Sequence, residues 1–483
     1  MLLTLVVIYL LVSIGIGVAA ARKVHSASDY ITAGRSLPMF MVVAMVFATW
    51  FGAETVLGIS ATFLDEGFRG LISDPLGAAI CLVLIGLVFA LPLYRMKLLT
   101  LGDFFHYRYN KKTEMVLSAC IMLSYLGWVS AQVTALGLVF NVLSEGTISM
   151  TAGMIIGAAV VMTYTLIGGM WSVAVTTCVQ MVVIVIGLLL VTGSATNMAG
   201  GIGNVVSQAA AEGKFQWLPS MDLIDILGWT AALFTLALGS IPQQDVFQRV
   251  NTSKSEKVAI WGTTLGGIAY FFFAAVPLLL AYSAGIVDPD QTAALMADDS
   301  QLVLPTFVFT HMPFWMQVVF FGALLSVIMS TASGTLLAPS VTFTENILRN
   351  FLPDMTDRQL LLYTRLTVFG FTLLVVLNSV MSSGNIHSMV ENAYRITLAG
   401  VFVPLTAGLF WRRASNFGCT LSIVLGLGSW LLLEIFYPEI AFEPQFVGLG
   451  FSLLGMIAGS IAKPNPHIAN FRGLAEPRGM AES

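Results

Sequence analysis

The sequence predicts an all-α polytopic membrane protein with thirteen transmembrane helices. Of its 483 residues, 57% are apolar and only 10% are charged, and the mean hydropathy is +0.87. A soluble domain carries about 25% charged residues, so this chain lacks the polar surface that a soluble enzyme needs. The net charge of −4, without a block of basic residues, also excludes a nucleic-acid partner.

The apolar runs give the positions of the helices, because a helix needs about 20 apolar residues to cross a hydrocarbon core roughly 30 Å thick. Arg22 and Lys23 follow the first run instead of preceding it, so we expect a retained helix and not a signal peptide. The loops at 198–226 and 285–313 are too short to form an independent domain. The thirteen runs are 2–21, 37–63, 70–94, 114–143, 148–168, 171–197, 227–248, 258–284, 314–344, 360–381, 388–411, 416–436 and 445–462.

The basic residues predict how these helices are oriented. Eighteen of the 22 Lys and Arg residues fall in one alternating set of loops, and the opposite set holds only Arg69 and Lys214. Short loops rich in Lys and Arg face the cytoplasm. We therefore expect an integral protein of the plasma (inner) membrane, with its N-terminus outside and its C-terminus in the cytoplasm.

Two of the predicted helices carry signs of a break at membrane depth. The second reads Ala48-Thr49-Trp50-Phe51-Gly52-Ala53-Glu54, and the seventh reads Gly239-Ser240-Ile241-Pro242-Gln243-Gln244-Asp245. Irregular backbone survives at this depth only where it lines a cavity or is covered by protein. Each break begins a block of five helices, and interrupted helices at matching places in two halves indicate an inverted-repeat transporter with its site near the midplane.

This pattern divides the chain into five parts. An extra helix over 1–21 precedes the first repeat, over 37–197. The second, inverted repeat spans 227–411. Two C-terminal helices over 416–462 and a cytoplasmic tail over 463–483 complete the chain.

Glu54 is the most informative charged residue, because a carboxylate at the centre of a membrane helix costs roughly 2.5–3.5 kcal/mol. It must face a wet cavity, be protonated or have a partner. Two interpretations stay open: Glu54 belongs to the permeation path, or it is a structural carboxyl that binds backbone groups freed by the break.

The other charged residues inside the helices suggest structural roles. Asp245 lies four residues before Arg249, which predicts an interfacial ion pair. Glu391 and Arg395 have the same spacing and can neutralise each other. Asp74 lies near the end of its predicted helix, and we assign it no role.

The ninth predicted helix is rich in hydroxyl groups between Ser326 and Thr335. Such groups are suitable oxygen ligands for a hard cation. Small residues of this kind also allow helices to pack closely, so the pattern alone leaves both interpretations open. The sequence shows no nucleotide motif and no metal-binding cluster of His, Cys, Asp or Glu. We therefore expect neither enzymatic activity nor an organic cofactor.

Several stretches together resemble the sodium:solute symporter family, which has the leucine-transporter type of fold. The amino-acid sequence around both breaks is also similar to that of the high-affinity choline transporters. The matching stretches, in the family's order, are Ser28-Asp29-Tyr30-Ile31-Thr32-Ala33-Gly34-Arg35, Leu99-Thr100-Leu101-Gly102-Asp103, Gly168-Gly169-Met170-Trp171-Ser172, Phe247-Gln248-Arg249-Val250 and Met329-Ser330-Thr331.

The resemblance implies symport of a small-molecule substrate with Na⁺ by alternating access, without an obligatory protein partner. Thr177 stands where several relatives keep an aspartate for sodium binding, which implies one Na⁺ per cycle. The implied sodium ligands are the carbonyls of Ala48, Phe51 and Val327 and the hydroxyls of Ser330 and Thr331.

The substrate is left open by these patterns. A choline-like cation would be held by the ring faces of Trp50 and Trp128, with Glu54 as the counter-charge. Gln243 stands where the aromatic cage of the choline transporters has another tryptophan. In a third reading, a proton carried by Glu54 replaces Na⁺. A neutral or anionic solute (sugar, amino acid or carboxylate) would instead be hydrogen-bonded by Gln132, Gln243 and Gln244.

Overall fold

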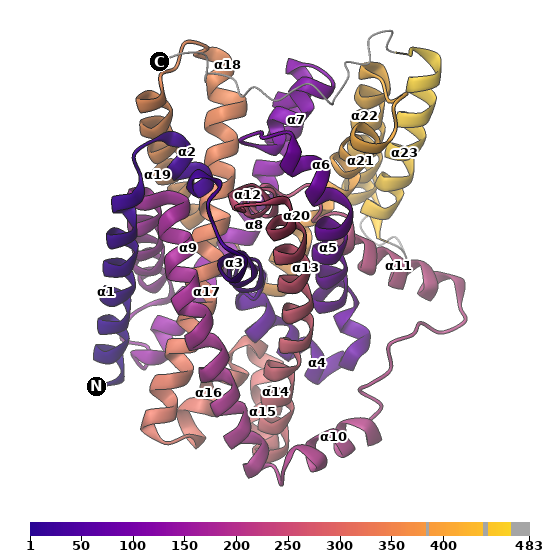
Figure 1. Ribbon diagram of the computed structural model, residues 1–483. Helices are drawn as coiled ribbons and strands as arrows, with labels where there is room; N and C mark the ends of the chain where they lie inside the picture. Colours follow the sequence, from indigo (N-terminus) through magenta and orange to yellow (C-terminus); the bar gives the residue numbers. More distant parts are fainter. Residues whose placement is uncertain (383–385, 438–442, 465–483) are drawn as a thin grey trace.

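The computed structural model is a bundle of long helices that run side by side (Figure 1). It describes residues 1–382, 386–437 and 443–464. In these ranges nine helices are long and apolar enough to cross a membrane, or ten if a pair bent by 47° near Val401 is counted as one span. Two shorter apolar helices, Met39–Trp50 and Leu223–Ala237, precede the two predicted breaks.

The helices follow one another along the chain with short connections. Short π-helical segments at Glu54–Gly58, Ile72–Gly77, Ile85–Phe89 and Phe343–Leu348 join some of them. The α-helices are α1 (Leu2–Ala20), α2 (Ala27–Thr32), α3 (Met39–Trp50), α4 (Ile59–Glu66), α5 (Ala78–Leu84), α6 (Ala90–Arg95), α7 (Leu101–Arg108), α8 (Lys111–Leu143), α9 (Met150–Met198), α10 (Ile202–Ala211), α11 (Leu223–Ala237), α12 (Gln244–Thr252), α13 (Glu256–Phe273), α14 (Ala275–Val287), α15 (Pro289–Asp298), α16 (Val303–His311), α17 (Phe314–Thr342), α18 (Arg349–Phe351), α19 (Asp357–Met381), α20 (Ile386–Gly400), α21 (Phe402–Phe410), α22 (Asn416–Phe436) and α23 (Pro444–Ala462).

The first break lies at the position that the sequence indicates. Helix α3 ends at Trp50, Phe51 leaves the helical region at φ −83° and ψ 76°, and the helix resumes at Glu54. A Cβ on Gly52 would lie 2.3 Å from Oε2 of Glu54. Only glycine therefore lets the carboxylate fold back over the break.

The second break separates α11 from α12. Helix α11 ends at Ala237, and α12 begins at Gln244 after an extended residue, Gln243, with φ −86° and ψ 134°. Pro242 lies between them, and proline has no backbone N–H to continue a helical ladder. Both breaks leave helix ends inside the bundle.

A third departure from regular helix lies within α9. The two predicted runs 148–168 and 171–197 form this one long element, kinked at Gly169, where φ is +49° and ψ is −134°. Residues with a Cβ avoid this backbone conformation. A Cβ at Gly169 would also lie 2.5 Å from the carbonyl oxygen of Tyr30, so both the backbone and the close approach require glycine.

Two of the stretches that resemble the family are helix starts. Ser26 and Asp29 form a capping box at the beginning of α2, and Thr100 and Asp103 form another at the beginning of α7. In each box the hydroxyl accepts from a backbone N–H while the carboxylate accepts from the N-cap N–H. These residues fix where the connecting segments turn into helix at the same end of the bundle.

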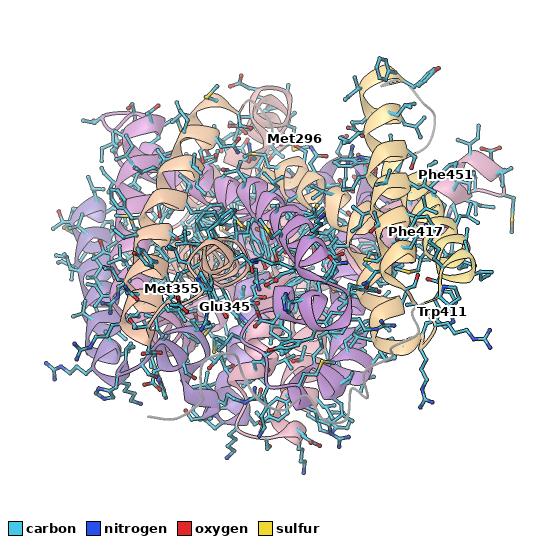
Figure 2. The ribbon with its side chains drawn as sticks, turned by 90° about the horizontal axis from the view of Figure 1, so that it is seen from above. Met296, Glu345, Met355, Trp411, Phe417 and Phe451 are labelled. Carbon is cyan, nitrogen blue, oxygen red and sulfur yellow. The ribbon has the colours of Figure 1, made fainter. Side chains whose placement is uncertain are left out.

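The long helices α8, α9 and α17 pack against one another at the centre of the bundle, and the broken helix α3 packs against α9 and α17. Helix α1 packs against α9 on one flank, and the α22–α23 pair stands on the opposite flank beside α20 (Figure 1). Seen from above, this yellow pair, with Phe417 and Phe451, lies to one side of the other helices (Figure 2). The flanking helices therefore lie outside the part of the fold that contains the breaks.

The charge of Arg395 acts on Glu391, as the spacing predicts, but the direct ion pairs of Arg395 are with other carboxylates. Arg395 lies 3.2 Å from Oε1 of Glu434 and 3.4 Å from Oε2 of Glu443. The spacing of four residues places the two side chains on one helix face. The approach of α22 and of the residue before α23 supplies nearer carboxylates, which only the tertiary fold could show.

Candidate functional site

The first break meets the hydroxyl-rich face of α17. The Ser330 hydroxyl donates to the carbonyl oxygen of Ala48 at 2.7 Å and also lies 2.9 Å from the carbonyl oxygen of Val327. Thr331 Oγ1 lies 3.3 Å from the same Ala48 oxygen. Four of the five residues expected to hold Na⁺ thus meet in one place, and the fifth, Phe51, lies in the break itself.

The helix end explains why backbone oxygens are available there. The last carbonyls of a helix have no partner further along the chain. Ser330 and Thr331 are fully buried and supply the missing hydrogen-bond donors. A set of carbonyl and hydroxyl oxygens of this kind suits a hard cation.

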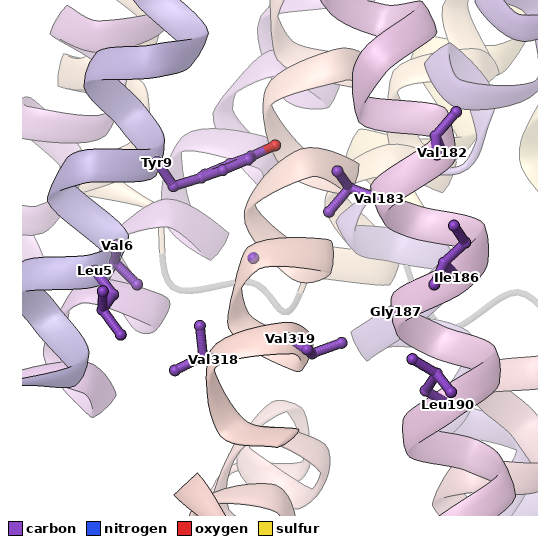
Figure 3. Close-up of a pocket in the computed structure, with 11 residues that line it drawn as sticks. Leu5, Val6, Tyr9, Val182, Val183, Ile186, Gly187, Leu190, Val318 and Val319 are labelled. Atoms are coloured by element: carbon purple, nitrogen blue, oxygen red, sulfur yellow. The ribbon is translucent and has the colours of Figure 1, made fainter. Parts of the chain in front are cut away.

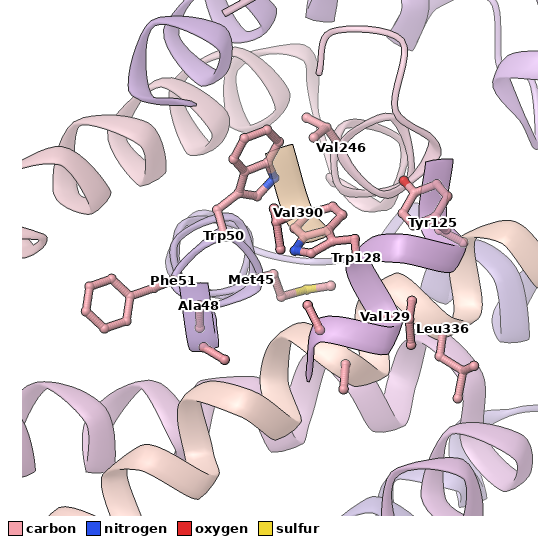
Figure 4. Close-up of a cluster of buried hydrophobic side chains, with 14 of the residues drawn as sticks. Met45, Ala48, Trp50, Phe51, Tyr125, Trp128, Val129, Val246, Leu336 and Val390 are labelled. Carbon is pink, nitrogen blue, oxygen red and sulfur yellow. The ribbon is translucent and has the colours of Figure 1, made fainter. Parts of the chain in front are cut away.

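Four aromatic side chains lie beside this contact, and we call Trp50, Tyr125, Trp128 and Tyr394 the aromatic cluster (Figure 4 shows the first three). The ring centroids of Trp50 and Trp128 are 5.7 Å apart, and those of Trp128 and Tyr394 are 5.6 Å apart. Tyr125 stacks on Trp128 at 6.0 Å. The cluster brings α3, α8 and α20 together, and all four side chains are buried.

The Glu54 carboxylate is hydrogen-bonded to α8. Oε1 accepts from Nε1 of Trp128 at 3.0 Å, and Oε2 accepts from Nε2 of Gln132 at 2.7 Å. The Gln132 carbonyl oxygen in turn accepts from the backbone N–H of Ala53, at 3.0 Å. Glu54 therefore has partners that hold it against the aromatic cluster, and Gln132 satisfies a backbone group freed by the break.

The side-chain amides of the two glutamines at the second break are hydrogen-bonded to groups outside the aromatic cluster. Gln243 Nε2 donates to the hydroxyl of Ser124 at 3.0 Å. Gln244 is directed to the start of α7, where its Oε1 accepts from the backbone N–H of Leu101 at 2.8 Å. The structure thus brings Trp50, Glu54, Trp128 and Gln132 together and places Gln244 elsewhere.

The predicted interfacial ion pair between Asp245 and Arg249 is wrong. Both residues are buried, and Nη1 of Arg249 donates to the backbone carbonyl of Asp245 at 2.8 Å. Nη2 of Arg249 donates to the hydroxyl of Thr49 at 2.9 Å, on the last turn of α3. The guanidinium therefore joins the two broken helices, and the Asp245 carboxylate faces Tyr125 instead.

Sequence analysis missed three aromatic residues that belong to this region. Tyr125 lies three residues before Trp128 on α8, a spacing that places both on one helix face and was a usable signal. Tyr394 comes from α20, and nothing local in the sequence marked it. Tyr270 on α13 donates to the buried Asp74 carboxylate and lies 3.3 Å from the hydroxyl of Thr55, so Asp74 is not at a solvent-exposed helix end.

A groove of about 350 Å³ between α1, α9 and α17 has a different character (Figure 3). Its lining is aliphatic except for Tyr9, whose hydroxyl is bonded to Ser326. Sites for polar solutes combine apolar walls with several placed polar groups. This groove therefore lacks the features of a polar solute site.

The amino-acid sequence of this chain is similar to those of known transporters. The chain is 27% identical over 466 residues to the high affinity choline transporter 1 of Homo sapiens, covering 90% of this chain and 79% of that protein. It is 24% identical over 478 residues to the sodium/glucose cotransporter of Vibrio parahaemolyticus, covering 91% and 86%.

A solved structure of a Na⁺-coupled sialic acid symporter, described as substrate-bound and outward-open, has the same fold. It superposes with a TM-score of 0.84 at 17% identity, covering 96% of this chain and 98% of that one. The profile of the sodium:solute symporter family matches residues 30–426, which confirms the resemblance seen in the sequence. The chain is a sodium-coupled transporter, not an enzyme, and it belongs to the sodium:solute symporter family.

Proposed function

We propose that this protein imports a small organic cation together with Na⁺ across the plasma membrane by alternating access. The aromatic cluster beside the buried Glu54 carboxylate is the observation that carries the proposal. Aromatic ring faces attract organic cations, most strongly where water is excluded. A carboxylate in the same low-dielectric surroundings favours a positive partner. A choline-like ion has this chemistry, which is also that of the choline transporter named above.

The hydrogen bonds of the glutamines support a cation over a neutral or anionic solute. Gln132 is occupied by Glu54 and the Ala53 N–H, Gln243 by Ser124, and Gln244 by Leu101. A sugar or carboxylate site needs free donors, and these amides would first have to break existing bonds.

For the coupling ion, we propose the carbonyls of Ala48, Phe51 and Val327 and the hydroxyls of Ser330 and Thr331 as ligands. The contacts between Ser330, Ala48 and Val327 support this set. Bound there, Na⁺ would replace the hydroxyl protons as the partner of the Ala48 oxygen and would hold α3 against α17.

One Na⁺ per cycle is the proposed stoichiometry, since Thr177 supplies no carboxylate for a second ion. One Na⁺ moving through 100 mV releases about 2.3 kcal/mol. A tenfold concentration gradient adds roughly 1.4 kcal/mol. Together they support roughly 500-fold accumulation of a neutral solute, and more for a cation that itself responds to the membrane potential.

The topology proposed for this function has thirteen membrane spans with the N-terminus outside. The breaks after α3 and α11 support two inverted repeats, over 37–197 and 227–411, flanked by 1–21 and 416–462. The proposed cytoplasmic tail, 463–483, lies outside the described residues from 465 onward.

Uptake into proteoliposomes that contain the purified protein tests this function. We expect radiolabelled choline or a related amine to accumulate under an inward Na⁺ gradient and to show saturable counterflow. Glucose, proline and lactate in parallel vesicles probe the neutral and anionic alternatives. Uptake that is independent of Na⁺ and driven by a proton gradient would contradict sodium coupling. Glu54 would then be the leading candidate for the proton carrier.

A further inference from the structure

Asp245 is a buried carboxylate that neither the proposed sodium site nor the bonds of Glu54 explain. It is fully buried in the first turn of α12. Its Oδ1 accepts from the hydroxyl of Tyr125 at 2.5 Å, while Oδ2 has no hydrogen-bond partner. A buried acceptor that lacks a partner is destabilising, so a ligand that donates a hydrogen bond to Oδ2 would be favoured.

The unfilled oxygen lies beside the aromatic cluster. Tyr125, which binds the other Asp245 oxygen, stacks on Trp128. The indole N–H of Trp50 and the backbone N–H of Val246 are donors that face the Asp245 carboxylate, and the charge of Arg249 also acts on it. Neither Trp50 Nε1 nor Asp245 Oδ2 completes a hydrogen bond of normal geometry. An unfilled acceptor and an unfilled donor therefore border the same set of rings (Figure 4 shows Trp50, Tyr125 and Trp128).

Glu54 differs from Asp245 in this respect. Both of its oxygens already accept N–H groups, from Trp128 and Gln132. Glu54 thus contributes negative charge beside the aromatic cluster, but its oxygens already have hydrogen-bond partners. Asp245 has the oxygen that a ligand can contact directly.

We propose that Asp245 binds the ammonium group of the substrate and selects a protonated amine that carries at least one N–H. An oxygen elsewhere in the substrate would accept from the indole N–H of Trp50. This inference rests on the proposed import of an organic cation and makes its substrate class more specific. A quaternary ammonium ion has no N–H to donate, so it would bind the rings but leave Asp245 Oδ2 unfilled.

Two simpler roles for Asp245 explain less of the structure. A carboxylate in the first turn stabilises a helix, but Asp225 in the first turn of α11 does so with both oxygens engaged, by Arg69 and Ser220. A sodium ion at Asp245 would need several oxygen ligands, whereas the groups that act on this carboxylate are mainly the Arg249 guanidinium and the N–H donors of Trp50 and Val246.

The test uses four amines that differ mainly in their number of N–H groups: ethanolamine, N-methylethanolamine, dimethylethanolamine and choline. All four carry one positive charge and one hydroxyl at neutral pH. Dissociation constants are measured on the full-length protein in detergent with saturating NaCl. We expect dimethylethanolamine, with one N–H, to bind about tenfold or more tightly than choline, because only it can donate to the carboxylate.

Three variants separate the role of Asp245 from general effects. Asp245→Asn should abolish the preference for N–H donors while leaving the Na⁺-dependent rise in melting temperature intact. Glu54→Gln should weaken the binding of all four amines by a similar factor and keep the preference for N–H donors. Asp225→Asn, which removes the first-turn acid from α11, should change neither the affinities for the amines nor the preference for N–H donors.

Several outcomes would overturn the inference. If choline binds at least as tightly as dimethylethanolamine, or Asp245→Asn keeps the preference, Asp245 is not the direct partner, while import of an organic cation still stands. If Asp245→Asn instead raises the Na⁺ concentration needed to increase the melting temperature in the absence of amine, the carboxylate binds Na⁺ and not the amine. If no member of the series binds, the organic-cation function fails as well.

Discussion

Individual residues at the first break gather backbone carbonyl and side-chain hydroxyl oxygens around a helix end. The carbonyl of Ala48 loses its helical partner, and Ser330 and Thr331 turn their hydroxyls toward it from α17. In the same region, the carboxylate of Glu54 folds back over Gly52 and binds α8. The chemistry of the site thus depends on a few atoms that a continuous helix would have hidden.

We expect Ser330→Ala to raise the Na⁺ concentration needed for half-maximal uptake by about tenfold, since loss of one oxygen ligand is worth on the order of 1–2 kcal/mol. Thr331→Ala should have a smaller effect in the same direction, because its hydroxyl is 3.3 Å from the Ala48 oxygen instead of 2.7 Å. The measurement is the Na⁺ dependence of uptake into proteoliposomes.

Ser340→Ala is the matched control on the same helix. Its hydroxyl is buried and donates to the carbonyl of Leu336, one turn earlier. A Na⁺ requirement that is unchanged in Ser330→Ala, or equally changed in Ser340→Ala, would exclude Ser330 as a ligand.

At the scale of elements, interruptions decide where the helices meet. The α3 and α11–α12 breaks place helix ends at the centre of the bundle, and Arg249 joins them through the Thr49 hydroxyl and the Asp245 carbonyl. The kink of α9 at Gly169 has another role, because it lets the Tyr30 carbonyl and ring approach the backbone closely. It therefore positions α2 against α9 and does not form part of the aromatic cluster.

Gly169→Ala should lower the apparent melting temperature of the purified protein. The positive φ costs a residue with a Cβ about 1–3 kcal/mol. The added Cβ would also have to displace the Tyr30 carbonyl, 2.5 Å away. The measurement is thermal unfolding in detergent at fixed Na⁺.

Gly193→Ala on the same helix provides the comparison. No heavy atom lies within 4 Å of a Cβ built there, and its φ is not positive. Alanine should be neutral or slightly stabilising at this position, because it has the higher helix propensity. Equal melting temperatures for the two variants would show that the kink is not needed for stability.

The basic residues of the whole molecule are distributed unequally between the two ends of the bundle. Connections that contain α2, α7 and α18 lie at one end of the bundle, and α10 and α15 lie at the other (Figure 1). The basic loops coincide with the first end, because Arg22, Lys23, Lys111 and Lys112 all belong to it. The positive-inside rule therefore predicts that this is the cytoplasmic end.

Cysteine labelling in intact cells tests the orientation. In a background without Cys81, Cys120, Cys178 and Cys419, single cysteines replace Asp290 on α15 and Lys112 on α8, both exposed. We expect a membrane-impermeant maleimide to label the first in intact cells and the second only after permeabilisation. The reverse pattern would invert the topology, and with it the direction proposed for import.

The sequence by itself determined the membrane class and the places of the two breaks, and its resemblance to the family implied the residues proposed to hold sodium. These features depend on local properties: the length of apolar runs, glycine and proline within them, and the helical spacing of Val327, Ser330 and Thr331. The matching stretches that identify the family are local in the same sense. None of them requires knowledge of which helices touch.

Only the tertiary structure decided which side chains share the aromatic cluster and which buried groups have partners. Tyr394 joins Trp50 across more than 300 residues of sequence. The Asp245 carboxylate accepts from Tyr125, while Arg249 bonds to the backbone carbonyl of Asp245 and not to its carboxylate. Gln244 is directed to α7 and not to the aromatic cluster. The physical reason is that a break frees the direction of the chain, so helix periodicity no longer fixes where a side chain points, and the packing of neighbouring helices does.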